Sequence, residues 1–137
     1  MPLAAIQGLR AAGIELGEVA ARLQELAKEK PEGWKKEYVE LRRLLHLRMD
    51  VAADRGEAVF RTGAAQEHAP AFREALRKLR HALALHQANW PVITISPENP
   101  EYRASMLDVM QAHQGLNAII EHIGAVSESY GKKLRRE

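Results

Sequence analysis

The sequence predicts an all-α fold, namely an antiparallel up-down helical bundle of about four helices. Apolar residues recur at alternating spacings of three and four over most of the chain, which is the period of a helix with one buried face. Short connectors containing glycine and proline separate these periodic segments, and short connectors make consecutive helices antiparallel neighbours. A chain of 137 residues can bury one ordinary core. We therefore expect a single helical-bundle domain over residues 1–131, followed by a frayed basic tail over residues 132–137.

The first helix is expected to run from about residue 3 to Lys28. A glycine inside a helix costs about 1 kcal/mol relative to alanine, so this helix is either held by packing or broken near Gly13. Gly13 and Gly17 are four residues apart on one face, where a second helix can approach closely. We therefore regard them as candidates for a dimer interface. The apolar stripe of this helix comprises Leu9, Ala12, Leu16, Val19, Leu23 and Leu26.

The second and third helices have clear end signals. The second is expected from Trp34 to about Thr62, and Gly63 is suited to be its C-terminal cap. The third is expected to end at Trp90, because Pro91 disfavours the helical conformation in the residue before it. The apolar stripe of the third helix comprises Phe72, Leu76, Leu79 and Leu83.

The segment after the third helix contains the β-branched run VITI. This composition favours a short extended segment over residues 91–96. Two interpretations of its side chains remain open. Val92, Ile93 and Ile95 either form an exposed edge that pairs with a second chain or a partner's strand, or tuck beneath the helices as a plug.

The fourth helix is expected to begin at Pro100, with Asn99 as its cap, and to end near Gly131. Its apolar stripe comprises Met106, Met110, His113, Ile120 and Ile123. Because His86 and His113 both continue apolar stripes, they are either core residues or members of a metal site or proton relay. The sequence alone leaves both interpretations open.

Composition and motifs exclude several functional classes. Cysteine is absent, which removes thiolate zinc sites, cysteine nucleophiles and disulfides. No apolar run approaches the roughly 20 residues that span a bilayer, so we expect a soluble cytoplasmic protein with no membrane contact. Neither the His-Glu-x-x-His zinc motif nor the Glu-x-x-His motif of di-iron bundles occurs. We therefore expect no metal, no cofactor and no catalytic residues.

A basic face is predicted on the third helix. Arg73, Arg77 and Arg80 are spaced i, i+4 and i+7, opposite the apolar stripe. Such a face can contact phosphates or an acidic protein surface. A solvated helix face without a partner gives the same pattern.

Two short stretches resemble known families. LRAAGIELGEVAARL, residues 9–23, is similar to the first part of helix-turn-helix domains, which implies a first helix ending at Gly13. AHQGLNAIIEHIGA, residues 112–125, resembles the active helix of histidine phosphotransfer domains, which implies that an exposed His113 accepts a phosphoryl group. The lysine and glycine that this family places after its histidine are replaced here by Leu116 and Asn117.

These patterns together predict a non-enzymatic protein-protein interaction module, such as an adaptor, a chaperone or a regulatory subunit. We expect it to bind another protein or to form a homodimer, through the face with Gly13 and Gly17 or through residues 91–96. One alternative is a nucleic-acid-binding regulator that uses the basic face at Arg73. A second alternative is a histidine phosphotransfer-like bundle centred on His113.

Overall fold

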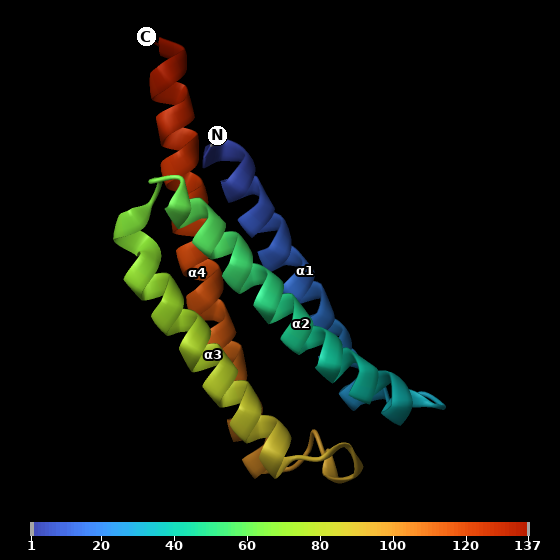
Figure 1. Cartoon of the computed structure of the whole chain (residues 1–137). Helices are drawn as coiled ribbons and strands as arrows, with labels where there is room; N and C mark the ends of the chain where they lie inside the picture. The colour runs from blue at the N-terminus through green and yellow to red at the C-terminus, as the bar shows by residue number, and fades with distance from the viewer. Residues whose placement is uncertain (1, 137) are drawn as a thin grey trace.

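The computed structural model describes the backbone of residues 2–136 and the side chains of residues 3–125. Four α-helices pack antiparallel, and no β-strand occurs within residues 2–136, so the predicted all-α bundle is confirmed (Figure 1). The helices are α1 (Pro2–Glu29), α2 (Trp34–Arg61), α3 (Ala69–Asn89) and α4 (Pro100–Arg136). Two short 3₁₀ turns, η1 (Gln66–His68) and η2 (Val92–Thr94), lie in the connectors.

The bundle consists of two helical hairpins. In one hairpin α1 packs along α2, and in the other α3 packs along α4. Contacts of α1 with α4 and of α2 with α3 join the two hairpins. Figure 1 shows that the hairpins lie close together at the end with the α2–α3 connector and diverge toward the opposite end. The diverging end is therefore the place where a surface between the hairpins can open.

At the close end, a glycine brings the two hairpins together. Gly13 of α1 is buried, and a Cβ there would lie 3.2 Å from Cδ1 of Ile120 in α4. This contact compensates for the low helix propensity of glycine, and α1 runs through Gly13 without a break. The resemblance of residues 9–23 to helix-turn-helix domains implies that the first helix ends at Gly13, and this expectation is wrong.

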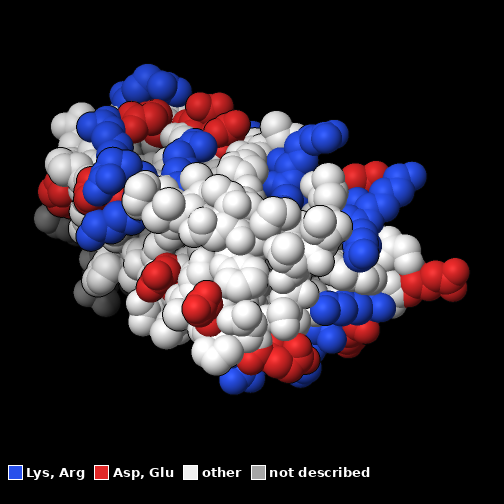
Figure 2. Space-filling model, turned by 90° about the horizontal axis from the view of Figure 1, so that it is seen from below, with Lys and Arg blue, Asp and Glu red and all other residues white. Residues whose placement is uncertain are grey.

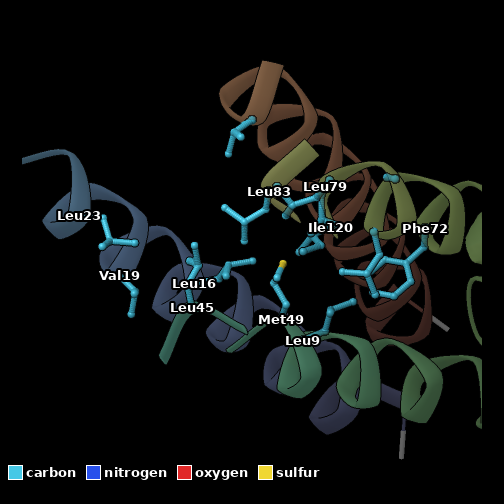
Figure 3. Close-up of a cluster of buried hydrophobic side chains, with 14 of the residues drawn as sticks. Leu9, Leu16, Val19, Leu23, Leu45, Met49, Phe72, Leu79, Leu83 and Ile120 are labelled. Carbon is cyan, nitrogen blue, oxygen red and sulfur yellow. The ribbon is translucent and has the colours of Figure 1, made fainter. Parts of the chain in front are cut away.

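The core lies between the hairpins and draws on all four helices (Figure 3). Leu9, Leu16, Met49 and Phe72 are at most 1% exposed, and Ile120 of α4 closes the cluster. Full burial of an aliphatic or aromatic side chain of this kind contributes about 1.5–3 kcal/mol. Most residues of the predicted apolar stripes thus lie in the core, and Met110 of the fourth stripe is an exception at 37% exposed.

The predicted end signals of the helices hold. Gly63 follows α2 with a φ of 86°, and its N–H donates to the carbonyl oxygen of Phe60 at 3.0 Å. Glycine adopts this left-handed conformation without steric cost, which confirms it as the C-terminal cap. At the start of α4, Oδ1 of Asn99 accepts the N–H of Glu101 at 2.8 Å, which confirms Asn99 as the cap.

Two boundaries differ from the sequence prediction. The α4 helix runs past Gly131 to Arg136, because a single glycine lowers helix propensity without blocking a hydrogen bond and no proline follows. The predicted extended segment over residues 91–96 is interrupted by the 3₁₀ turn η2. Both the N–H and the hydroxyl of Thr94 donate to the carbonyl oxygen of Pro91, which closes the turn.

Candidate functional site

A groove of about 560 Å³ opens between α1 and α4 at the diverging end of the bundle. Its walls include Ala27 of α1 and Met106, Leu107 and Met110 of α4. Seen from this end, uncharged residues form the middle of the surface, acidic side chains interrupt it on one side, and most of the charged side chains lie around its edge (Figure 2). The walls of the groove are mainly apolar.

The apolar side chains of the groove are accessible to solvent. Leu107 is 51% exposed and Met110 is 37% exposed. Met110 was expected in the core stripe of the fourth helix, and the splaying of the hairpins leaves it at the surface instead. Methionine side chains are flexible and polarisable, so a surface that contains Met106 and Met110 can adapt to an apolar partner.

Charged groups at the groove leave it slightly basic. Lys28 of α1, Arg103 of α4 and Glu98 of the connector line it. Arg103 donates from Nε to the carbonyl oxygen of Pro97 at 3.0 Å. Within the described part of the chain, neither cation forms an ion pair with a carboxylate. Both positive charges are thus available to an acidic partner.

The floor of the groove adjoins a smaller internal cavity. Gln24, Tyr102 and Met106 line both spaces, and the cavity measures about 40 Å³. All four helices contribute to its wall. Its polar lining comprises Gln24, Tyr38, Arg42, His86, Gln87 and Tyr102.

His86 is the most deeply buried polar residue of this cavity. It is 2% exposed, and its Nδ1 lies 2.8 Å from Oγ of Ser105. The other ring nitrogen, Nε2, is buried without a hydrogen-bond partner among the described residues. Burial, and secondly the nearby charge of Arg42, lower the pKa of the imidazole from 6.5 to about 4. His86 is therefore neutral at neutral pH.

Two tyrosines and an arginine complete the cluster. Burial raises the pKa of Tyr102, and the neighbouring Tyr38 raises it further by its negative charge when ionised and by their shared hydrogen bond. The guanidinium carbon of Arg42 lies 4.8 Å from the centre of the Tyr38 ring, in cation–π geometry. Arg42 also donates from Nη2 to the carbonyl oxygen of Trp90 at 2.8 Å. It thus ties α2 to the end of α3.

The arginines of the predicted basic face are all paired with carboxylates. Arg73 pairs with Glu57, Arg77 with Glu74 and Arg80 with Asp50, at N···O distances of 2.7, 2.5 and 2.9 Å. The hydrogen bond from Arg73 lowers the pKa of the Glu57 carboxyl, and that from Arg77 does the same to Glu74. These pairs reduce the net positive charge that the face presents.

The two glycines of the predicted dimer face lie in different surroundings. Gly13 is buried against α4, whereas a Cβ on Gly17 would meet no atom within 4 Å. Gly17 therefore lies beside open space where a helix can approach, and contact of this face with a second chain stays a prediction.

The residues of the predicted edge point in different directions. Ile93 is 77% exposed, Val92 is half-buried and Ile95 is 5% exposed. Ile95 tucks into the core, which agrees with the interpretation as a plug. Because η2 forms a 3₁₀ turn, the exposed extended edge is not present, and contact of Ile93 with a partner stays a prediction.

His113 does not present Nε2 to solvent. This nitrogen is buried and has no hydrogen-bond partner among the described side chains, and burial lowers the pKa of the imidazole. The phosphotransfer resemblance requires an exposed ring. No cluster of three or more His, Asp or Glu side chains in residues 3–125 is placed to hold a metal ion.

Sequence reasoning missed the groove and most of the cavity. Leu107 lies outside the predicted stripe of the fourth helix. Arg42 resembles any other surface arginine in sequence. The one signal was His86, which continues the third stripe as a polar residue on an apolar face.

Comparison of the chain with protein-family models, with curated proteins and with solved structures finds no match. No helix within residues 2–136 is both long enough and apolar enough to cross a bilayer.

Proposed function

We propose that this chain is a non-enzymatic interaction module that binds an amphipathic helix of a partner protein in the groove between α1 and α4. The observation that carries the proposal is the groove of about 560 Å³ with Leu107 and Met110 exposed on its wall. An amphipathic helix laid into an apolar groove is a common mode of protein recognition. The docked helix would lie where the hairpins diverge and add a further helix to the bundle.

The charge of the groove identifies the chemistry of the partner. Lys28 and Arg103 carry positive charge without ion-pair partners among the described side chains, so acidic residues beside the apolar face of the partner helix would complement them. A symmetric contact between two copies through this groove would bring like charges together, because the same patch faces itself. We therefore favour a different, acidic protein over a second copy as the occupant.

The polar cluster supports a non-enzymatic role. Ser105 and His86 have the spacing of a hydroxyl nucleophile and its base. No carboxylate among the described residues contacts the other ring nitrogen of His86, so the orienting third group of a catalytic triad is missing. Both residues serve the packing of α3 on α4 in this proposal.

The test uses two leucines with matched exposure. Leu107 in the groove is 51% exposed and Leu85 on α3, outside the groove, is 52% exposed. We expect the wild-type chain and Leu85→Glu to capture the same protein from lysate of the native host, and Leu107→Glu to lose it. With the purified partner, calorimetry should then give a Kd about tenfold or more weaker for Leu107→Glu alone.

Two results would contradict the proposal. Equal binding of the partner by both variants would place the interface elsewhere on the molecule. The second is a wild-type dimer in sedimentation experiments, with no other protein bound, that becomes a monomer in Leu107→Glu. This result would identify a second copy as the occupant.

A further inference from the structure

We propose that the polar cavity between the hairpins binds one small anion of about the size of chloride. The site is distinct from the groove, and the inference does not depend on the partner helix. It follows from the charge of the cavity, from its unpaired hydrogen-bond donors and from its size.

The charge of the cavity is positive. Among the described residues that line it, Arg42 carries the single full charge and no residue is a carboxylate. Arg42 is partly buried. It contacts the Trp90 carbonyl oxygen and the Tyr38 ring, and it forms no ion pair with a carboxylate among the described residues. Charges withdrawn from water are normally paired. An anion in the cavity supplies the missing counter-charge.

Two buried nitrogen atoms add directional contacts. The side-chain amide of Gln87 bonds through Oε1 to Nε2 of His46 at 2.8 Å, which leaves the amide nitrogen Nε2 of Gln87 buried without a partner. His86 is equally unpaired at Nε2, since its Nδ1 faces Ser105. When the Ser105 hydroxyl donates to Nδ1, the ring proton sits on Nε2 and can be donated to the anion. His86 remains neutral in this arrangement.

The size of the cavity limits the ligand. Its volume is about 40 Å³, whereas a single water needs roughly 10–15 Å³ of such space. A monatomic halide is only slightly larger than water and fits this volume. Because Arg42 belongs to α2 and both His86 and Gln87 belong to α3, the bound anion would link the two hairpins.

The decisive experiment is crystallography of the full chain in sodium bromide. We expect an anomalous bromide peak within hydrogen-bonding distance of the guanidinium of Arg42 and the amide nitrogen of Gln87. In Gln87→Glu the carboxylate keeps an acceptor for His46 and introduces a negative charge, so the peak should disappear. Water at this position in wild-type crystals, with no anomalous signal, would overturn the proposal.

A solution experiment separates the cavity from surface cations. The NMR line width of chloride increases in the presence of a protein that binds the ion, and we expect this excess width to fall to the buffer level in Gln87→Glu. The control is Arg103→Gln, which removes an exposed cation outside the cavity. The opposite result would be an excess line width that is lost in Arg103→Gln and kept in Gln87→Glu. That result would assign the bound ion to the surface and refute the cavity site. If Gln87→Glu does not fold by circular dichroism, the wild-type bromide crystals decide alone.

Discussion

Gly56 of α2 and Phe72 of α3 touch so closely that a Cβ on residue 56 would overlap the Phe72 ring. The ring has no room to withdraw, because Phe72 is 1% exposed and packs edge-on against Phe60 with 5.6 Å between ring centres. Glycine is therefore required at position 56 for the two hairpins to meet at this end of the bundle.

Replacement of this glycine should destabilise the fold. We expect Gly56→Ala to lower the free energy of unfolding by about 1–3 kcal/mol, the usual cost of overpacking a core. Gly115→Ala is the matched control, because residue 115 is also in a helix and a Cβ there meets no atom within 4 Å. The control should raise stability by about 0.5–1 kcal/mol. Urea denaturation measures both changes, and equal effects of the two variants would contradict the close contact.

Protonation of His86 should make the protein sensitive to acid. Its pKa is about 4 in the folded protein and near 6.5 when unfolded, so the unfolded state binds the proton more tightly. The stabilising contribution is complete above about pH 6.5 and is lost as the pH falls toward about 4, by roughly 2–3 kcal/mol. The titratable and charged groups that line the cavity with His86 are Arg42, Tyr38 and Tyr102, and α1 contributes no charged group to it.

This sensitivity is measured as the free energy of unfolding against pH. We expect His86→Gln to show a shallower loss between about pH 6.5 and 4, even if it is less stable at neutral pH. His81→Gln, which replaces an exposed histidine on the same helix, should follow the wild type. Burial also lowers the pKa of His113, so this residue contributes a slope of the same sign in all three proteins. Identical slopes for His86→Gln and the wild type would show that His86 is not the responsible group.

The hydrogen bond between Tyr38 and Tyr102 should couple the two hairpins. A double-mutant cycle with Tyr38→Phe and Tyr102→Phe isolates this bond, because each change removes one hydroxyl and keeps the ring. We expect a coupling energy of about 0.5–1.5 kcal/mol in chemical denaturation. Additive effects within about 0.3 kcal/mol would mean that the two hydroxyls act independently.

The paired arginines predict weak binding to nucleic acid. Because Arg73, Arg77 and Arg80 are each held by a carboxylate, we expect a labelled duplex to bind poorly even at about 50 mM salt. Fluorescence anisotropy measures this binding. Two results together would favour the nucleic-acid alternative instead. The affinity for the duplex would be high at about 50 mM salt and fall by about 10³ at about 200 mM, and a triple arginine-to-glutamine variant would abolish the binding.

Local signals predicted the helices well because they act within one or two turns. Pro91, Asn99 and Gly63 fixed three helix ends through backbone chemistry that needs no tertiary contact. Local signals of this kind do not decide whether α1 is continuous through Gly13. Whether the helix breaks at Gly13 depends on Ile120, which is more than a hundred residues away in the sequence.

Apart from His86, the candidate site could not be predicted from local signals. Tyr38 and Arg42 are neighbours one turn apart on α2, but Tyr102 of α4 meets them only because of the relative placement of the two hairpins. The groove depends on the same placement: Met110 lies on the predicted apolar stripe, yet it is 37% exposed because the hairpins diverge beside it. The angle between packed helices is set by many side chains together, so a single sequence does not reveal it.

The division into two hairpins has a consequence for how the protein can be assembled. Each hairpin pairs helices that are consecutive in the chain, and the connector between the hairpins contains the exposed Gly63. Cleavage at this connector would leave every helix whole, so two separately produced halves should recombine in trans by fragment complementation. The anion cavity draws Arg42 from the first half and His86 from the second, so it would re-form only when the fragments meet.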